Sequence, residues 1–235
     1  MNEIDPKAEP GDPIVDAIER WLGRPAPGYD YVRIGKLLAA VDTARFVEHH
    51  MPTAPIFRTV PQLHRAALEQ RGVAGLVMEF GVASGKSVNF LAKQLPGQTV
   101  HGFDSFEGLP EDWLRSYRRG HFAQPLPKVE PNVELVVGWF EDTLPGFLRD
   151  HPEPVSYLHV DCDLYSSTKT IFDHLGDRIR AGTVIVFDEY FNYPSWREHE
   201  HKAFTEFAES RNVRFHFLGA VRSGVQAAVV IDSIG

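Results

Sequence analysis

Two apolar, β-branched stretches of the sequence both end in pairs of carboxylates. VSYLHV is followed by Asp161 and Asp163, and TVIVF is followed by Asp188 and Glu189. If the two stretches are neighbouring parallel strands, all four acids meet at one edge of a sheet. Four anions in one place repel each other, and an all-oxygen donor set selects Mg²⁺, Mn²⁺ or Ca²⁺ over zinc. The pattern predicts a divalent metal site with Asp161, Asp188 and Glu189 as ligands.

The same acids have a second interpretation, as N-caps of the following helices and as solvated loop residues, because Asp is common before helices. Ser166 or Ser167 could supply the cap of the helix after the first stretch, which weakens this alternative for Asp163. One residue of register also decides whether Asp161 or Asp163 faces the metal. Both questions stay open from the sequence alone.

A glycine loop lies earlier in the chain, in LVMEFGVASGKS, between a predicted strand and an amphipathic helix. Open α/β sheets bind nucleotides at such a loop. A P-loop needs four residues between its first glycine and Gly-Lys-Ser, and here only three separate Gly81 from Gly85. The middle glycine of a dinucleotide fingerprint would fall on Ala83. The remaining pattern, Glu79 followed by Gly-x-x-x-Gly, suits S-adenosylmethionine, which carries an ammonium and a carboxylate but no phosphate. A tight packing turn is the structural alternative.

The ends of the next two predicted strands add candidate cofactor contacts. HGFDSFEGL puts Asp104 where an acid can take both ribose hydroxyls, although a dinucleotide enzyme would share that acid. GWFED, after the third strand, offers an aromatic wall for an adenine ring. The predicted cofactor-binding residues are Glu79, Gly81, Ala83, Gly85, Ser87, Asp104, Ser105, Phe106, Gly138, Trp139, Phe140 and Asp161.

The metal and the cofactor together indicate a reaction. A cation that binds two neighbouring hydroxyls of a substrate lowers the pKa of one and orients it toward the methyl-sulfonium carbon. An adjacent carboxylate can then take the proton, and Asp163 is the candidate base, with Asp161 as its catalytic partner. We therefore expect a Mg²⁺-dependent O-methyltransferase. The rivals are a metal-independent methyltransferase, a nucleotide-binding oxidoreductase or kinase, and a non-catalytic S-adenosylmethionine-binding protein.

A sheet must bring these residues together. From about residue 74 the pattern alternates between strand and helix, which is typical of a mostly parallel sheet covered on both faces. The expected strands are Gly75–Phe80, Thr99–Phe103, Val133–Val137, Val155–Val160, Thr183–Phe187, Val213–Leu218 and Val225–Ile231. The expected helices are Ile14–Leu22, Val32–His49, Val60–Gln70, Ser84–Gln94, Thr143–Asp150, Ser166–Ile179 and Trp196–Ser210.

These elements predict an α/β, Rossmann-like fold: a seven-stranded, mostly parallel sheet with a C-terminal antiparallel hairpin and an N-terminal helical cap. Residues 1–72 are expected to form the cap or lid, and residues 73–235 the S-adenosylmethionine-dependent domain. EHEH, around Glu200, resembles a metal cluster, but its histidines lie two apart rather than one helical turn apart, so we expect a solvated helix face.

Composition narrows the function classes. The formal net charge of −8 argues against a nucleic-acid partner, because phosphate binding needs clustered Lys and Arg. No apolar stretch is long enough for a membrane span, and the start of the chain lacks the pattern of a signal peptide, so we expect a soluble, cytoplasmic protein. Its one cysteine, Cys162, excludes an intramolecular disulfide. The oligomeric state stays open, a homo-oligomer included.

At this point the residues resemble a known family. Five stretches of the sequence, in this order, are similar to the macrocin O-methyltransferase (TylF/MycF-like) group of class I methyltransferases: EFGVASGKSVNFLAK, GFDSFEGLPEDW, VVGWFEDTLPGFL, HVDCDLYSSTKT and IVFDEYFNYPSW. The resemblance covers about Leu76 to Phe204. It implies S-adenosylmethionine and Mg²⁺ as cofactors, and a sugar hydroxyl of a natural product or glycoconjugate as the acceptor.

The resemblance also implies roles for single residues. Glu79, Gly81 and Gly85 would contact the methionine part, Asp104 the ribose, and Trp139 and Phe140 the adenine side; Asp161, Asp188 and Glu189 match metal positions, and Asp163 matches the base. In the related catechol-type enzymes the base is a Lys three residues after the first metal Asp, and here Leu164 occupies that position. The segment Leu114–Glu130, which carries Arg115, Arg118, Arg119 and His121, does not match strongly and is a candidate lid over the acceptor.

Overall fold

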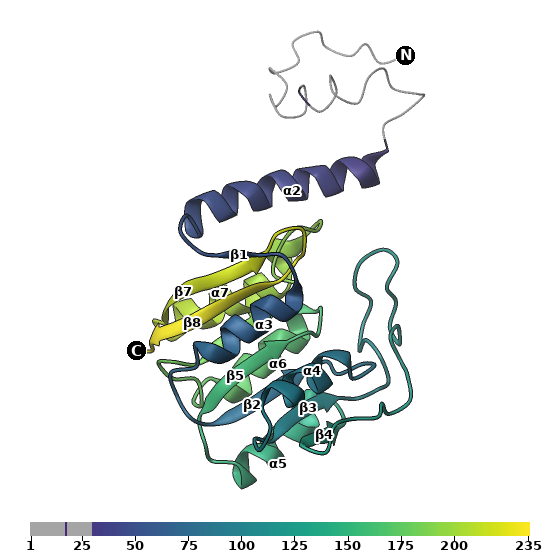
Figure 1. Ribbon diagram of the computed structural model, residues 1–235. Coiled ribbons are helices and arrows are strands. Elements are labelled where there is room, and N and C mark those ends of the chain that lie inside the picture. Colours follow the sequence, from purple (N-terminus) through teal and green to yellow (C-terminus); the bar gives the residue numbers. More distant parts are fainter. Residues whose placement is uncertain (1–16, 18–29) are drawn as a thin grey trace.

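Apolar, largely buried strands form the centre of the structure. The computed structural model describes residue 17 and residues 30–235, and its strands join into one eight-stranded sheet in the order β1-β7-β8-β6-β5-β2-β3-β4 (Figure 1). The parallel centre consists of β2 (Leu76–Phe80), β3 (Val100–Asp104), β4 (Val133–Val137), β5 (Val155–Val160) and β6 (Val184–Phe187). Strands buried on both faces are near-continuous apolar runs, which is why the sequence reveals them clearly.

The C-terminal strands form the predicted antiparallel hairpin. β7 (Arg214–Val221) pairs with β8 (Ala227–Ser233), and β8 pairs antiparallel with β6. The prediction of seven strands was wrong by one, because β1 (Ile56–Phe57) adds a parallel edge strand next to β7. Two residues are too few for a period-two pattern to stand out in the sequence.

Helices cover both faces of the sheet. α3 (Val60–Glu69) and α4 (Lys86–Gln94) lie on one face, where Leu63 and Val88 pack in the same core cluster as Val77 of β2. α5 (Phe140–Asp150), α6 (Tyr165–Leu175) and α7 (Glu200–Ser210) lie on the other face, over Met78 and Phe80. α2 (Tyr31–His50) lies beyond the β7 end of the sheet (Figure 1).

Two helix predictions need correction, and a third concerns residues that, apart from residue 17, the structure does not describe. The helix predicted at Trp196–Ser210 is broken at His199, into the 3₁₀ turn η1 (Trp196–Glu198) and α7. The helix predicted to run to Ile179 ends at Leu175, before Gly176. The helix predicted at Ile14–Leu22 lies outside the described residues, residue 17 excepted.

The first 72 residues do not all lie apart from the sheet. α3 packs against β6, β7 and β8, and β1 extends the sheet itself. The division into a cap of residues 1–72 and a domain of residues 73–235 stays a prediction. Within residues 30–235, no helix combines the length and the apolar character that crossing a membrane would require.

The buried imidazole of His64, in α3, predicts a pH-dependent stability. The side chain is 2% exposed, and its Nδ1 lies 2.6 Å from the hydroxyl of Tyr157. Burial, with a smaller contribution from the charge of His159, lowers the pKa of His64 to about 3. An unfolded histidine titrates near pH 6.5, so acid protonates the unfolded chain first. The contribution is fully present above about pH 6.5 and is lost as the pH falls toward 3.

We therefore expect the free energy of unfolding to lose roughly 2 kcal/mol from His64 alone between pH 7 and pH 5. Urea unfolding at the two pH values measures this loss, and His64→Gln should show a loss smaller by about that amount. The matched control is His216→Gln, because His216 is exposed and pairs with Asp232 at the surface. A His64→Gln variant with the parent's full acid sensitivity would contradict the assignment.

Candidate active site

A cavity of about 690 Å³ opens at the carboxyl ends of the central strands. The chain leaves β2 toward β3 and β4 on one side and later returns to place β5 and β6 on the other, and such a switch point is where open α/β sheets bind ligands. The cavity is lined by Gly81, Ala83, Asp104, Ser105, Gly108, Leu109, Pro110, Glu111, Phe122, Trp139, Phe140, Glu141, Asp161, Cys162, Asp163, Ser166, Ser167, Thr170 and Glu189. The glycine loop and part of the acidic set therefore share one cavity.

The glycine loop needs its first glycine for two reasons. Gly81 has φ +93°, a conformation that side chains disfavour, and a Cβ there would collide with the backbone carbonyl oxygen of Asp161. β2 and β5 thus approach each other closely where the cavity begins. Gly85, with φ +78°, begins α4.

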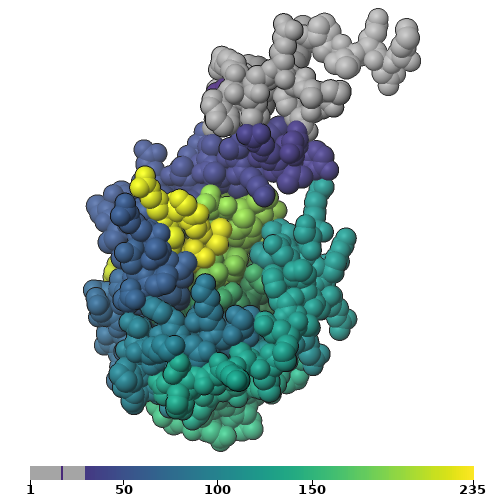
Figure 2. All heavy atoms as spheres, turned by 45° about the vertical axis from the view of Figure 1, so that its right-hand side comes forward, coloured from purple at the N-terminus to yellow at the C-terminus, as the bar shows by residue number. Residues whose placement is uncertain are grey.

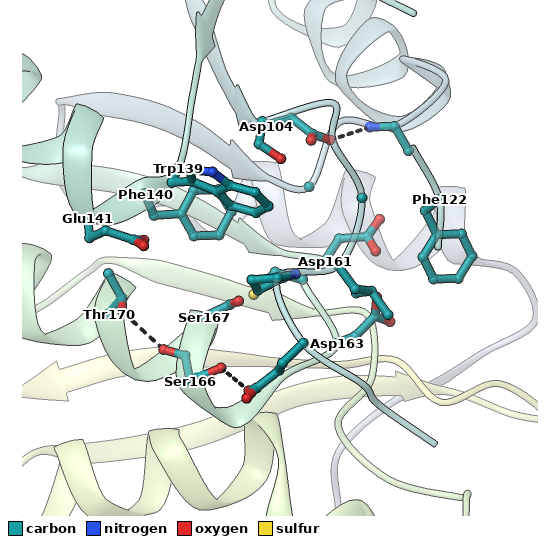
Figure 3. A pocket seen from close by; sticks show the side chains of 18 of the residues that line it. Asp104, Phe122, Trp139, Phe140, Glu141, Asp161, Asp163, Ser166, Ser167 and Thr170 are labelled. Carbon is teal, nitrogen blue, oxygen red and sulfur yellow. Dashed lines mark hydrogen bonds between the residues drawn. The ribbon is translucent and has the colours of Figure 1, made fainter. Parts of the chain in front are cut away.

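Asp104 fastens the glycine loop. One carboxylate oxygen accepts hydrogen bonds from the backbone N–H groups of Val82 and Ala83, at 2.9 and 2.8 Å, and the other accepts from Phe106 N–H at 2.7 Å (Figure 3). Backbone donors that converge on one carboxylate hold the loop in a single shape. Asp104 lines the cavity as well, so both the loop and a ligand can meet it.

Aromatic side chains form opposite walls of the cavity. Trp139 and Phe140, which were predicted from the sequence, lie on one side, and Phe122 lies on the other with Asp161 between them (Figure 3). Phe122 was missed, because it belongs to the loop between β3 and β4 (residues 105–132), which has no helix or strand period. Its φ of +72° was likewise invisible in the sequence. The loop contains the candidate lid predicted at Leu114–Glu130, and we call the whole loop the lid segment.

The lid segment reaches the cavity and α2. Glu111 accepts a hydrogen bond of 2.6 Å from Ser166 of α6, and Arg115 lies over the ring of Tyr31, at the start of α2. Figures 1 and 2 both show the segment extending toward α2. Of the predicted basic patch, Arg118 is paired with Asp112 at 2.7 Å on the surface.

Several predicted cofactor residues do not line the cavity: Glu79, Gly85, Ser87, Phe106 and Gly138. Glu79 is fully buried in β2, and its carboxylate accepts a hydrogen bond from Ser87 and contacts His159 of β5, each at 2.9 Å. Its contact with a cofactor stays a prediction. In the structure it orients the side chain of His159.

The acids after β5 lie on the cavity, and they do not cap α6. Asp161 and Asp163 line the cavity, and the N-cap of α6 is Leu164, without a side-chain hydrogen bond. The N-cap interpretation of Asp163 was therefore wrong, and neither Ser166 nor Ser167, which could have supplied the cap, does so. Asp163 has φ +63°, and a non-glycine residue in that region is held there by its surroundings.

The acids after β6 face in different directions. Glu189 lines the cavity, whereas Asp188 does not; its carboxylate accepts a hydrogen bond from Gln226 of 3.2 Å and lies 3.9 Å from Nε2 of His159. The ligand atoms of His159, Asp161 and Asp188 all lie within 4.8 Å of one another. Two of the three predicted metal ligands, Asp161 and Asp188, are thus neighbours, and His159 lies in the place expected for Glu189.

A fifth acid was missed. Glu200, the first residue of α7, is fully buried, and one of its carboxylate oxygens accepts a hydrogen bond of 3.0 Å from Glu189 N–H. The prediction of a solvated helix face was wrong for Glu200. The break at His199 turns it inward, and no pattern in EHEH signals that break.

Burial, and after it mutual repulsion, disfavours negative charge in this acidic cluster (Asp161, Asp163, Asp188, Glu189 and Glu200). Burial, followed by the charges of neighbouring acids, raises the pKa values of Asp161, Glu189 and Glu200, and raises that of Asp163 to about 7. For Asp188 burial acts in the same direction, but its contacts with His159 outweigh it and lower the pKa. Each of these carboxylates gains from added positive charge.

The residues present fit a divalent cation. Glu189 Oε2 and Glu200 Oε1 are buried, and no hydrogen-bond partner reaches them among the described residues. Buried, unpartnered carboxylate oxygens are costly unless a cation or a proton compensates them. His159, Asp161 and Asp188 would hold such an ion, and Glu189 and Glu200 would remain close to it.

The hydrogen bonds of Asp104 generate a prediction about cofactor binding. Asp104→Ala removes three backbone hydrogen bonds and should loosen the glycine loop. We expect the affinity for S-adenosylmethionine to fall by about ten-fold or more, and stability by roughly 1–3 kcal/mol. Calorimetric titration measures the affinity and urea unfolding the stability. The control is Asp173→Ala, because Asp173 pairs with Lys169 on the exposed side of α6. Unchanged affinity in Asp104→Ala would remove Asp104 from the binding site.

Comparison with known proteins adds independent information. Residues 78–190 match a family described as a methyltransferase domain. The chain is 31% identical over 144 residues to 8-demethyl-8-(2,3-dimethoxy-alpha-L-rhamnosyl)-tetracenomycin-C 4'-O-methyltransferase of Streptomyces olivaceus, a match that covers 51% of this chain and 54% of that protein. It is 26% identical over 151 residues to demethyldecarbamoylnovobiocin O-methyltransferase of Streptomyces niveus, covering 54% and 56%. The chain thus spans about half the length of the curated relatives it matches.

A solved structure supports the fold. The O-methyltransferase NovP has a TM-score of 0.57 and 20% identity, over 74% of this chain and 80% of that one. This likeness confirms the predicted Rossmann-like methyltransferase fold. The narrower resemblance to the macrocin group stays a prediction. The protein is thus similar to O-methyltransferases in sequence over about half of the chain and in fold over 74% of it.

Proposed function

We propose that the protein transfers a methyl group from S-adenosylmethionine to a hydroxyl of a small molecule, with the help of a divalent cation. One observation carries the proposal: a single cavity joins the glycine loop and Asp104 to Asp161 and Asp163. A methyl donor and a deprotonating group must share a cavity for such a transfer. The methyltransferase-domain match over residues 78–190 supports the same reaction class.

The cofactor end of the cavity is assigned to the glycine loop and the aromatic wall. Gly81 and Ala83 of the loop line the cavity, and Asp104 would meet the ribose hydroxyls while it holds the loop. Trp139 and Phe140 offer flat faces for an adenine ring.

The acceptor end is assigned to the acids and the lid segment. Asp163 lies on the cavity wall in a conformation fixed by its loop, and it would take the proton from the attacking hydroxyl. Phe122 and Leu109 of the lid segment line the same cavity and would exclude water from it. A bound divalent cation would supply Lewis-acid polarisation of the acceptor hydroxyls. Leu164 occupies the position of the lysine base of the catechol-type enzymes, so this chain has no lysine base at that position.

The acceptor is proposed to be a sugar hydroxyl of a natural product or glycoconjugate. The tetracenomycin relative is named for methylation at a 4' position of a rhamnosyl-bearing compound. In this chain, Phe122 gives the acceptor side an aromatic face on which a sugar ring could stack, and Glu111 and Ser166 give it hydrogen-bonding groups.

Asp163→Asn tests the base. The amide has nearly the shape of the carboxylate but cannot accept the proton, so we expect methyl transfer to fall by about 10²-fold or more while S-adenosylmethionine affinity changes little. Single-turnover assays with a panel of glycosylated acceptors measure transfer, and calorimetry measures binding. Asp173→Asn, on the exposed side of α6, is the matched control. Full activity in Asp163→Asn would require a different base.

Removal of divalent cations tests the metal requirement. We expect EDTA to abolish methyl transfer and added Mg²⁺ or Mn²⁺ to restore it. The added cation would compensate the negative charge of the acidic cluster and polarise the acceptor hydroxyl. Asp188→Asn should raise the cation concentration needed for half-maximal rate by about ten-fold or more. Unchanged turnover in EDTA would favour the metal-independent alternative.

A further inference from the structure

The buried histidine of β5 is held in one orientation. His159 is 1% exposed, and its Nδ1 lies 2.9 Å from Oε2 of Glu79. The other oxygen of Glu79 accepts a hydrogen bond from Ser87, also at 2.9 Å. Because Glu79 is fully buried and shared in this way, it cannot turn toward another partner without leaving His159 unpaired. The imidazole is therefore fixed with Nε2 pointing away from Glu79.

Nε2 of His159 is directed at carboxylates without making a hydrogen bond. No partner meets it among the residues that the structure describes, and the nearest acid oxygen, Oδ1 of Asp188, lies 3.9 Å away. That separation is too long for a hydrogen bond. It leaves room for an ion, because the ligand atoms of His159, Asp161 and Asp188 lie within 4.8 Å of one another.

The arrangement matches the chemistry of a metal-bound histidine. Histidines that bind metals almost always give their other ring N–H to a carboxylate or carbonyl, which fixes the tautomer and the ring direction. Glu79 is such a carboxylate. If Nδ1 carries the hydrogen, Nε2 presents a lone pair to the space between Asp161 and Asp188.

The geometry points to His159 as a nitrogen ligand of the cation site, which would make the site select a first-row transition ion such as Mn²⁺ or Co²⁺ over Mg²⁺. This inference rests on the proposed function, because it concerns the cation of the same active site. Mg²⁺ prefers oxygen ligands only, whereas an imidazole nitrogen suits transition ions. A site of one nitrogen and two carboxylates should therefore bind Mn²⁺ more tightly than Mg²⁺.

The alternative is an imidazolium that bridges Glu79 and Asp188 as an ion pair and never binds metal. Both arrangements orient the ring in the same way, so the test must detect the nitrogen directly. The 14N nucleus of a coordinated imidazole couples to the unpaired electrons of Mn²⁺, and pulsed electron paramagnetic resonance records this coupling without any turnover.

The experiment uses the full chain, stripped of metal and titrated with Mn²⁺, then with Mg²⁺ in competition. We expect a 14N coupling in the parent protein and its loss in His159→Gln. The ratio of Mn²⁺ to Mg²⁺ affinity should fall by about ten-fold or more in that variant. His64→Gln is the matched control, since His64 is also a buried histidine and its ring lies 4.7 Å from that of His159. It should keep both the coupling and the ratio.

Two results would overturn the inference: a parent protein that binds Mn²⁺ without 14N coupling, or a His159→Gln variant that keeps the coupling and the ratio. The parent spectrum decides even if His159→Gln does not fold, and His159→Asn provides a second variant. S-adenosylmethionine titration and a methyl-transfer assay with Mn²⁺ run on the same samples. Cofactor binding and methyl transfer without 14N coupling would show that His159 is not a ligand of the cation, and the proposed function would still hold. Failure of cofactor binding would defeat the function itself.

Discussion

Repulsion between buried carboxylates is the constraint on which the active site depends. The sheet places Asp161 and Asp188 at the ends of adjacent strands, and α7 brings Glu200 beside Glu189 from the other direction. Burial and the neighbouring negative charges raise the pKa values of Asp161, Glu189 and Glu200, whereas the contacts of Asp188 with His159 help to lower the pKa of Asp188. Buried carboxylates destabilise the fold unless a cation or a proton compensates their charge. The charge that would bind a cation for the reaction therefore also affects the stability of the loops that carry these acids.

The backbone adds a geometric constraint to this charge. Because a side chain at Gly81 would collide with the carbonyl of Asp161, the glycine loop and the acidic loop after β5 lie in direct backbone contact. Asp104 fastens the glycine loop to β3 in turn. The proposed donor side and the proposed acceptor side of the cavity are therefore linked through these backbone contacts, which suits a transfer that needs its reacting atoms in line.

Much of this arrangement could be predicted from the sequence, because it follows from local patterns. Buried parallel strands are continuous apolar runs, and acids or glycines directly after them fall at the carboxyl edge of the sheet. Asp104, Trp139 and Asp163 were found in that way. Phe122 and Glu200 were not, since their positions depend on a lid segment without period and on a helix break at His199. The role of Glu79 also escaped, because its partner His159 lies 80 residues away in the chain.

The short strand β1 has a consequence for how the chain can be trimmed. It pairs with β7, the long outer strand of the hairpin, and α3 covers the adjoining face over β6 and β8. A protein cut at residue 72 would lose both and would expose the backbone groups at the end of β7, where Ala220 and Val221 pair with β1, beside uncovered Val184 and Val230. An exposed, apolar strand edge invites pairing with other copies of the chain. The segment that was expected to be an accessory cap thus covers part of the sheet edge and of the apolar face beside it.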